Sequence, residues 1–335
     1  MKSKINLYDV TLRDGSHAIS HQLTEQQIDA YTQLIDKTGI YAIEVGHGNG
    51  LGASSVLVGQ SRISDEMLIK TAKNNLHNTK LGIHVIPGFA TINKDIKNAL
   101  SWGVDIVRVA SHCTEADTTE RHIGYVREKG KEAYGLLMMS HMTTPEILFD
   151  EAIKMQTYGA EAIVILDSAG SYLPNDVKER ISLLSQNLNV PVGFHAHNNL
   201  GLAISNSLVA IEAGAQIIDG AVKGFGAGAG NAQLEVLVAV LEKLKYSTHV
   251  DLYKILDVAD MVEKNLIKEP ITISSLSIVS AIAGVFSGFS KHVKRISNEF
   301  GIDSRDIFME LGRQKIVAGQ EDTIIDIAMK LQKRI

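Results

Sequence analysis

Two histidines spaced two residues apart, His195 and His197, are the side chains of this sequence best suited to chemistry. In an extended strand, side chains two positions apart point to the same face and lie roughly 7 Å apart along the chain. Two such imidazoles can bind one divalent cation, and a distant carboxylate would complete a facial triad with open coordination positions. Asp14 is the candidate carboxylate. The pattern predicts a catalytic metal site.

Arg13 and His17 flank the candidate carboxylate. The guanidinium of Arg13 suits stabilisation of an oxyanion or binding of a carboxylate, with a salt bridge at the mouth of the fold as the alternative. His17 has the intrinsic pKa of a general base. Adjacent residues of a regular strand face opposite ways, so Arg13 and Asp14 can share a site only where the chain leaves strand geometry. We expect Gly15 to permit that departure.

The composition indicates a protein with an ordinary apolar core. Of 335 residues, 45% are hydrophobic and 21% are charged, and the formal net charge is −5. A nucleic-acid partner would favour a basic surface, so the charge argues against one. Cys113 is the single cysteine, which excludes an intrachain disulfide, and we expect it to be a packing residue. No signal-like segment or apolar run of ~20 residues occurs, so a cytoplasmic protein without a membrane span is expected.

Apolar, β-branched runs alternate with amphipathic helical patterns, which favours a parallel sheet with crossover helices. The predicted strands are residues 5–12, 42–46, 81–86, 106–109, 134–139, 162–166, 192–195 and 217–221. The predicted helices are residues 25–38, 65–75, 94–102, 119–129, 145–158, 175–188, 202–213 and 232–245. Eight such units predict an α/β fold, a (β/α)8 TIM barrel over residues 1–246, with a doubly wound open sheet as the alternative.

The remaining residues, 247–335, lose the strand pattern and predict a small helical C-terminal domain. Helices are expected over 252–265, 275–289 and 323–331. Phe286 and Phe289 are expected to be buried, either against the barrel or in a partner surface. The basic run 291–295 is expected to be a solvated helix face.

Chemistry in TIM barrels lies at the C-terminal ends of the strands. Asp14 follows the first predicted strand, and His195 and His197 end the seventh, so the three can converge. Ser168 follows the sixth strand and would hydrogen-bond a substrate carboxylate. Five further histidines near strand ends are expected to be pocket or core residues: His47, His84, His112, His122 and His141.

A glycine-rich loop, residues 224–231, follows the eighth predicted strand. Such a loop could bind a phosphate, as TIM barrels often do near strands 7 and 8. It could equally form the floor of the site, with its backbone close to the metal and no side chains in the way. Asn231 is a candidate for an additional oxygen ligand.

The segments DVTLRDG (9–15) and HAH (195–197) resemble the DRE-TIM metallolyases, which combine a TIM barrel and a divalent metal with enolate chemistry on oxo acids and acyl thioesters. Within that superfamily the sequence resembles the 4-hydroxy-2-oxovalerate aldolases over nearly its whole length. The motifs that carry this resemblance are TLRDGSHAI (11–19), HCTEAD (112–117), LMMSHM (137–142), GAGAGN (226–231) and GQED (319–322).

The resemblance implies cleavage of a 4-hydroxy-2-oxo acid to pyruvate and an aldehyde, or the reverse aldol addition, in the catabolism of aromatic hydrocarbons. Asp14, His195 and His197 would bind the metal, with Mn²⁺ expected first and Co²⁺ or Mg²⁺ as alternatives. Arg13 would stabilise the enolate and His17 would be the base. Arg13, Ser168, His195 and Phe286 would contact the substrate. An acylating aldehyde dehydrogenase is the implied protein partner, and an oligomer is expected.

The sequence departs from that family on the aldehyde side. Phe286 stands where the family has a tyrosine that reaches the substrate hydroxyl, so the donor is missing. His84 replaces an aliphatic residue near the aldehyde path, Asn199 replaces a histidine, and Asn49 replaces an aspartate. These differences predict an altered aldehyde preference or relaxed stereocontrol at C4.

Three other functions fit parts of the pattern. A Claisen-type acyltransferase of the same superfamily would carry glutamine at His17 and glutamate at Ala227, which disfavours it. A phosphate-binding TIM-barrel isomerase would use the glycine-rich loop and need no metal. A non-catalytic assembly subunit would not need His17 at all.

Overall fold

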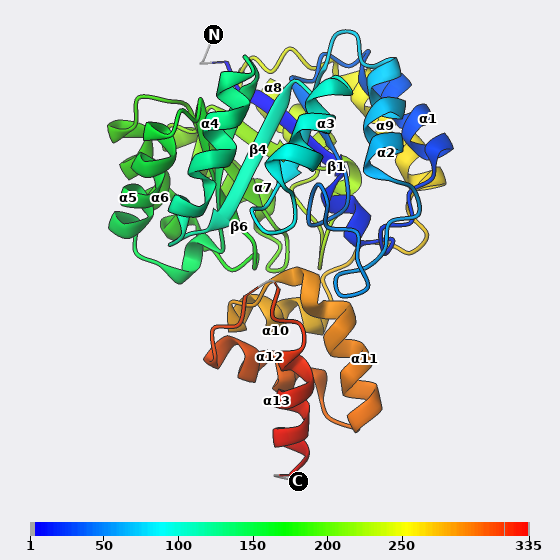
Figure 1. The fold of residues 1–335 in the computed structure, drawn as a ribbon, viewed down its shortest axis with the longest axis vertical. Coiled ribbons are helices and arrows are strands. Elements are labelled where there is room, and N and C mark those ends of the chain that lie inside the picture. The colour runs from blue at the N-terminus through cyan, green and yellow to red at the C-terminus, as the bar shows by residue number, and fades with distance from the viewer. Residues whose placement is uncertain (1–3, 318, 334–335) are drawn as a thin grey trace.

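Eight parallel strands close into a barrel in the computed structural model, which describes residues 4–317 and 319–333 (Figure 1). The strands pair in sequence order, and β1 pairs with β8 to close the ring. They are β1 (Asn6–Leu12), β2 (Ala42–Val45), β3 (Lys80–Val85), β4 (Ile106–His112), β5 (Glu132–Met138), β6 (Ala162–Asp167), β7 (Val192–Ala196) and β8 (Ile217–Gly220). The predicted TIM barrel is confirmed, and the open sheet is excluded.

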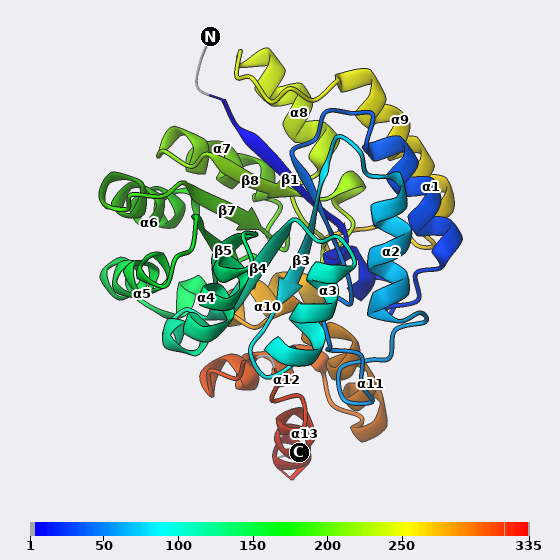
Figure 2. The same cartoon turned by 45° about the horizontal axis from the view of Figure 1, so that its top comes forward.

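Helices α1 to α8 surround the barrel (Figure 2). They are α1 (Glu25–Ile35), α2 (Asp65–Asn75), α3 (Lys97–Ser101), α4 (Glu120–Glu128), α5 (Pro145–Thr157), α6 (Pro174–Asn187), α7 (Ala203–Glu212) and α8 (Leu234–Lys243). Thr24 begins α1 with a capping box, because its hydroxyl accepts from Gln27 N and the Gln27 side chain accepts from Thr24 N. The predicted helix 94–102 instead combines a π-helical turn, Ile92–Ile96, with the short α3.

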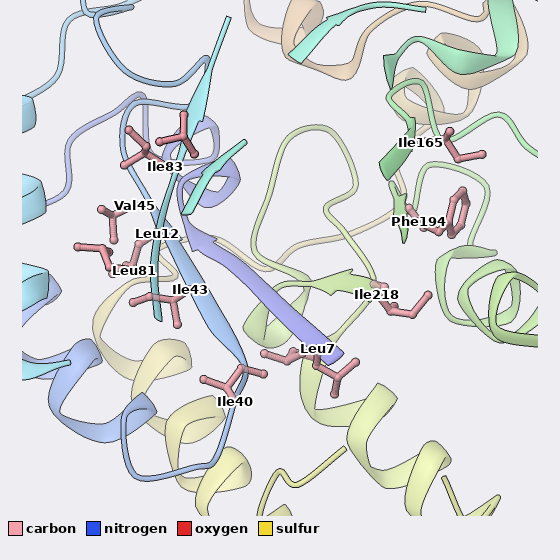
Figure 3. Close-up of a cluster of buried hydrophobic side chains, with 14 of the residues drawn as sticks. Leu7, Leu12, Ile40, Ile43, Val45, Leu81, Ile83, Ile165, Phe194 and Ile218 are labelled. Carbon is pink, nitrogen blue, oxygen red and sulfur yellow. The ribbon is translucent and has the colours of Figure 1, made fainter. Parts of the chain in front are cut away.

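Alternation along the strands separates an apolar outer layer from a partly charged interior. Leu7, Ile43, Leu81, Phe194 and Ile218 belong to the buried cluster shared by the strands and the surrounding helices (Figure 3). The neighbouring strand positions face the barrel axis, since successive side chains point to opposite faces. Three buried charged side chains lie on such positions: Glu44, Arg108 and Asp219. The barrel interior therefore holds a layer of charged side chains.

A separate helical tail covers the C-terminal ends of the strands (Figures 1 and 2). It consists of α10 (Ser275–Ala283), α11 (Ser290–Phe300), α12 (Ser304–Arg313) and α13 (Thr323–Gln332), with its own apolar cluster. The prediction of one helix over 275–289 is wrong. The helix stops at Gly284, whose φ of 65° closes it in the left-handed conformation that glycine favours. Phe289 is buried in the tail cluster, whereas Phe286 is only half-buried.

Helix α9 (Leu252–Asn265) follows the barrel and packs on its outside. Ile255, Val258 and Val262 of this helix are buried in the apolar cluster of the barrel rather than in that of the tail. The predicted division into residues 1–246 and 247–335 stays a prediction, and these contacts associate α9 with the barrel side. In the part of the chain that the structure describes, every helix is too short or too polar to cross a membrane.

Candidate active site

The chain leaves strand geometry directly after β1. This departure is needed if the adjacent residues Arg13 and Asp14 are to face the same site. Arg13 has φ −114° and ψ −69°, and a 3₁₀ turn, Asp14–His17, follows it. Gly15 has no positive φ, so the expected reason for this glycine is wrong. A Cβ on Gly15 would lie 2.2 Å from the Phe225 ring, so close packing explains the glycine instead. The turn allows the side chains of Arg13 and Asp14 to reach one cavity.

Asp14, His195 and His197 form a group that can hold a metal ion. One ligand atom from each lies within 4.8 Å of the others, and all three residues are buried. His195 Nδ1 donates to Asp219 Oδ2 at 2.9 Å, and His197 Nδ1 donates to the carbonyl oxygen of Asp167 at 2.9 Å. These bonds orient both rings and leave each Nε2 as a ligand, an arrangement typical of metal-binding histidines. Among the described residues, His197 Nε2 is buried without a hydrogen-bond partner and lies 3.7 Å from Asp14 Oδ2, so both atoms can bind one cation.

Electrostatics keep the Asp14 carboxylate ionised. Burial by itself raises the pKa of Asp14, but Arg13, followed by His197 and His17, holds it well below the usual range. Arg13 Nη1 donates to Asp14 Oδ1 at 2.9 Å. An anionic carboxylate beside two imidazole nitrogen ligands suits divalent transition metals. The residues present therefore fit a divalent cation.

The glycine-rich loop supports this carboxylate. Ala227 N and Asn231 Nδ2 donate to Asp14 Oδ2 at 3.0 and 2.8 Å. Asn231 Oδ1 is buried without a partner, which leaves it available as an additional oxygen ligand. The backbone amide of Ala229 donates to Asn199 Oδ1 at 2.9 Å. Because the amides of Ala227 and Ala229 already have partners, the geometry favours the loop as a floor beside the metal over the phosphate-binding alternative.

Gly226→Ala is expected to weaken cation binding without unfolding the barrel. The added Cβ would lie 2.6 Å from Asp14 Oδ2 and 2.2 Å from Asn231 Nδ2, so the carboxylate must move. We expect a loss of about 10- to 100-fold in cation affinity, the range seen when groups supporting metal ligands are disturbed. Titration calorimetry with Mn²⁺ measures it. Gly124→Ala, whose Cβ meets nothing within 4 Å, is the matched control. Equal affinity in both variants would contradict the role given to the loop.

Arg13 presents one free donor to the cavity. Its Nε donates to Glu44 Oε2 at 2.6 Å, and its Nη1 is used by Asp14. The remaining nitrogen, Nη2, is buried and has no partner in the structure. Two carboxylates thus hold the guanidinium rigidly while the two N–H bonds of Nη2 stay available. This is the arrangement needed to stabilise an oxyanion.

His17 lies at the end of the 3₁₀ turn with its ring in the cavity. Burial lowers the pKa of His17 to about 4, although Asp14 opposes the shift. The ring is therefore neutral near pH 7 and can accept a proton. It packs edge-on against Phe286, with ring centroids 6.0 Å apart. A Cβ on Gly48 would lie 2.5 Å from the ring, so Gly48 leaves the space that His17 occupies.

One cavity of about 320 Å³ brings the predicted residues together. Those that border it are Arg13, Asp14, His17, Ser168, His195, His197 and Phe286. Ser168 Oγ accepts from Met139 N at 3.0 Å, which leaves its hydroxyl hydrogen free to donate. Phe286 and His17 also border a second cavity of about 610 Å³ between barrel and tail. Of the other histidines, His84 and His112 border the first cavity.

Sequence reasoning missed the charged residues inside the barrel. Arg108 Nη2 donates to Asp219 Oδ2 at 2.6 Å, and Asp219 in turn orients His195. Arg108 also lies 3.5 Å from Glu44, the carboxylate that holds Arg13. The signal was present, because charged residues interrupt three otherwise apolar predicted strands. Such interruptions indicate paired charges in a buried position.

Beyond the geometry, the class of the protein follows from two family models. The HMGL-like model matches residues 4–262, which include the barrel and its three metal-ligand candidates. The DmpG-like communication domain matches residues 271–333, the helical tail. The chain is thus an HMGL-like barrel followed by a communication domain.

Two curated relatives narrow the class. A 4-hydroxy-2-oxovalerate aldolase of Pectobacterium atrosepticum is 59% identical over 334 residues, covering 100% of this chain and 97% of the relative. The 4-hydroxy-2-oxovalerate aldolase of Spirochaeta aurantia is 58% identical, covering 97% of this chain and 96% of the relative. This chain belongs to the 4-hydroxy-2-oxovalerate aldolase family, as the sequence motifs predict.

Among solved structures, the carboxyl transferase domain of Rhizobium etli pyruvate carboxylase superposes with a TM-score of 0.82. The match covers 99% of this chain and 61% of that chain at 16% identity. At this identity the likeness supports the fold alone.

Proposed function

We propose that the chain is a divalent-metal-dependent aldolase that cleaves a 4-hydroxy-2-oxo acid to pyruvate and an aldehyde, or catalyses the reverse addition. The observation that carries the proposal is the single cavity described above. It combines a buried metal-ligand group, a free guanidinium donor and a neutral imidazole. These are the three groups that a retro-aldol reaction of a 2-oxo acid requires.

A divalent cation bound by Asp14, His195 and His197 would supply a Lewis acid that polarises the 2-oxo group. Mn²⁺ is the cation we propose first, with Co²⁺ or Mg²⁺ as alternatives. The ligand types alone do not choose among these cations, because affinity order and cellular supply also decide. Ser168 donates its hydroxyl hydrogen to the substrate carboxylate and orients the oxo acid.

The proton leaves the C4 hydroxyl for the ring of His17. The O–H electron pair forms the aldehyde C=O bond as the C3–C4 bond breaks, and that bond's electrons form the enolate of pyruvate. Arg13 Nη2 donates to the oxygen on which the negative charge develops. Because Glu44 and Asp14 already hold the guanidinium, little reorganisation is needed at that moment.

The decisive experiment measures exchange of the pyruvate methyl protons with solvent deuterium by metal-stripped protein, with and without added Mn²⁺. Restoration of both exchange and cleavage of 4-hydroxy-2-oxovalerate by the cation supports the proposal. Full activity without any cation, together with protection by phosphate esters, would favour the isomerase instead. Condensation of an acyl thioester with a 2-oxo acid would favour the Claisen-type alternative.

We also propose an acylating aldehyde dehydrogenase as the protein partner, supported by the match of the tail to a communication domain. The released aldehyde would be its substrate. Gel filtration of the two coexpressed proteins tests this, and it also reports the oligomeric state. Separate elution at micromolar concentration would count against the partnership.

Phe286→Tyr is expected to sharpen stereocontrol at C4. The wild-type ring borders the cavity beside His17 but has no hydrogen-bond donor for the substrate hydroxyl. A hydroxyl there would favour one hydroxyl orientation by about 1 kcal/mol, the usual net value of one hydrogen bond. Chiral chromatography of products from a panel of aldehydes measures the change. Strict use of acetaldehyde with one C4 configuration by the wild type would contradict the prediction.

A further inference from the structure

A short segment of the tail spans the mouth of the barrel. Phe286 packs against the His17 ring, and one residue later Ser287 accepts from Asn199 Nδ2 at 2.7 Å. Ser287 Oγ also lies 3.4 Å from the Ser168 carbonyl oxygen, to which it donates. Lys291 follows one helical turn later, at the start of α11. The segment thus touches the loops after β1, β6 and β7.

Lys291 contacts the turn that carries His17. Its Nζ donates to the carbonyl oxygens of His17 and Ala18 at 2.8 and 3.2 Å, and to Ser20 Oγ at 2.8 Å. An ammonium group has three protons, and all three have acceptors here. Lys291 is exposed, as expected for the basic run 291–295, but its charged end is bonded to the barrel.

The contact matters because the His17 ring has little else to orient it. In the part of the chain that the structure describes, the ring makes no hydrogen bond and only packs against neighbours. Its position therefore depends on the backbone of the turn. Carbonyl oxygens at the end of a helical turn lack most intrahelical partners, and a cation there satisfies them. Within the described residues, the His17 oxygen accepts only a long bond from Ser20 N, at 3.3 Å, besides the bond from Lys291.

We propose that Lys291 is a positioning residue for His17, so that the tail sets the rate of proton removal in the barrel. The inference rests on the proposed function, in which His17 removes the C4 hydroxyl proton. Without the ammonium, the turn can shift by a fraction of an ångström or more, and proton transfer is sensitive to such displacements. Asp14 begins the same turn, but Arg13, Ala227 N and Asn231 Nδ2 hold its carboxylate independently of Lys291.

The test compares Lys291→Met with Lys294→Met, a control on the same helix. Lys294 is exposed, and within the described residues it makes no hydrogen bond or ion pair. We expect Lys291→Met to lower kcat for cleavage about 10-fold with KM nearly unchanged, since misplacement rather than binding is affected. Lys291→Arg should recover most of the loss, because a guanidinium also donates to carbonyls. Lys294→Met should behave as wild type.

A double-mutant cycle with His17→Ala tests whether Lys291 affects kcat through His17. If Lys291 acts through His17, Lys291→Met changes kcat less than about twofold once His17 is absent. Amide hydrogen exchange of residues 16–20 should also accelerate in Lys291→Met alone. A full 10-fold loss in the His17→Ala background, or an unchanged kcat in Lys291→Met, would overturn the inference.

Failure of the proposed function gives a different result. In that case wild-type protein with Mn²⁺ neither exchanges pyruvate protons nor cleaves the hydroxy-oxo acid. If wild type does both and Lys291→Met matches it, only the role of Lys291 is refuted.

Discussion

Replacement of Asp14 by asparagine is expected to lower aldol cleavage by about 10³-fold, since loss of Lewis-acid stabilisation costs several kcal/mol and each 1.36 kcal/mol is tenfold in rate. The amide cannot replace the anionic ligand. Its NH₂ group would also face the donors Ala227 N and Asn231 Nδ2. Calorimetry with Mn²⁺ and a coupled assay for pyruvate measure the two effects.

The control for this variant is Asp117→Asn, which changes an exposed carboxylate outside the cavity. It should bind Mn²⁺ and cleave substrate as wild type does. The cooperativity of thermal unfolding should be preserved in both variants, which shows that the barrel still folds. Wild-type affinity for Mn²⁺ in Asp14→Asn would remove Asp14 from the metal site.

The second large effect is expected at His17. His17→Ala should lower kcat for cleavage by about 10²- to 10⁴-fold, the usual contribution of a general base. Exchange of the pyruvate methyl protons should decline much less, because the metal group and Arg13 remain intact. The affinity for Mn²⁺ should not change. His77→Ala, at an exposed histidine outside the cavity, is the matched control.

An equal loss of exchange and cleavage in His17→Ala would separate His17 from the C4 hydroxyl and place it in the enolate half of the reaction. In that case Lys291 would position a residue of the enolate half of the reaction, not the base for the C4 hydroxyl. Comparing the two assays is therefore more informative than either rate alone.

The lowered pKa of His17 predicts that the proposed base stays unprotonated at unusually acidic pH. Burial lowers the pKa from its ordinary value of 6.5 to about 4, with Asp14 opposing the shift. A group with a lowered pKa keeps its neutral form as pH falls, so His17 should remain a base between pH 6.5 and about 4. An NMR titration of the histidine rings, with the His17 signal assigned by its absence in His17→Ala, should show a midpoint near 4. A midpoint near 6.5 would show that the ring is solvated.

Periodicity predicted the fold correctly, and spacing predicted that the three metal-ligand candidates converge. Alternation along strands and glycines after helices are local features, so eight β/α units can be counted without coordinates. The C-terminal ends of parallel strands meet at one end of a barrel. The convergence of Asp14 with His195 and His197 follows from that rule, although Asp14 and His195 are 181 positions apart in the sequence.

Other features depended on contacts between distant segments. The apolar run after Ser275 has the composition of one long helix, yet it ends at Gly284, and α11 begins six residues later at Ser290. Gly15 is small because the Phe225 ring packs against it, which no local pattern reveals. Glu44, Arg108 and Asp219 pair only because β2, β4 and β8 face one another across the barrel.

The sequence by itself determined the (β/α)8 order, the ligand types and the strand ends on which they stand. These follow from local periodicity and from the chemistry of individual side chains. Only the tertiary structure decided which donors stay free, such as Arg13 Nη2, and which tail residue reaches His17. The physical reason is that a hydrogen bond between residues far apart in the chain depends on how the barrel and the tail pack, and packing leaves no periodic trace in either segment.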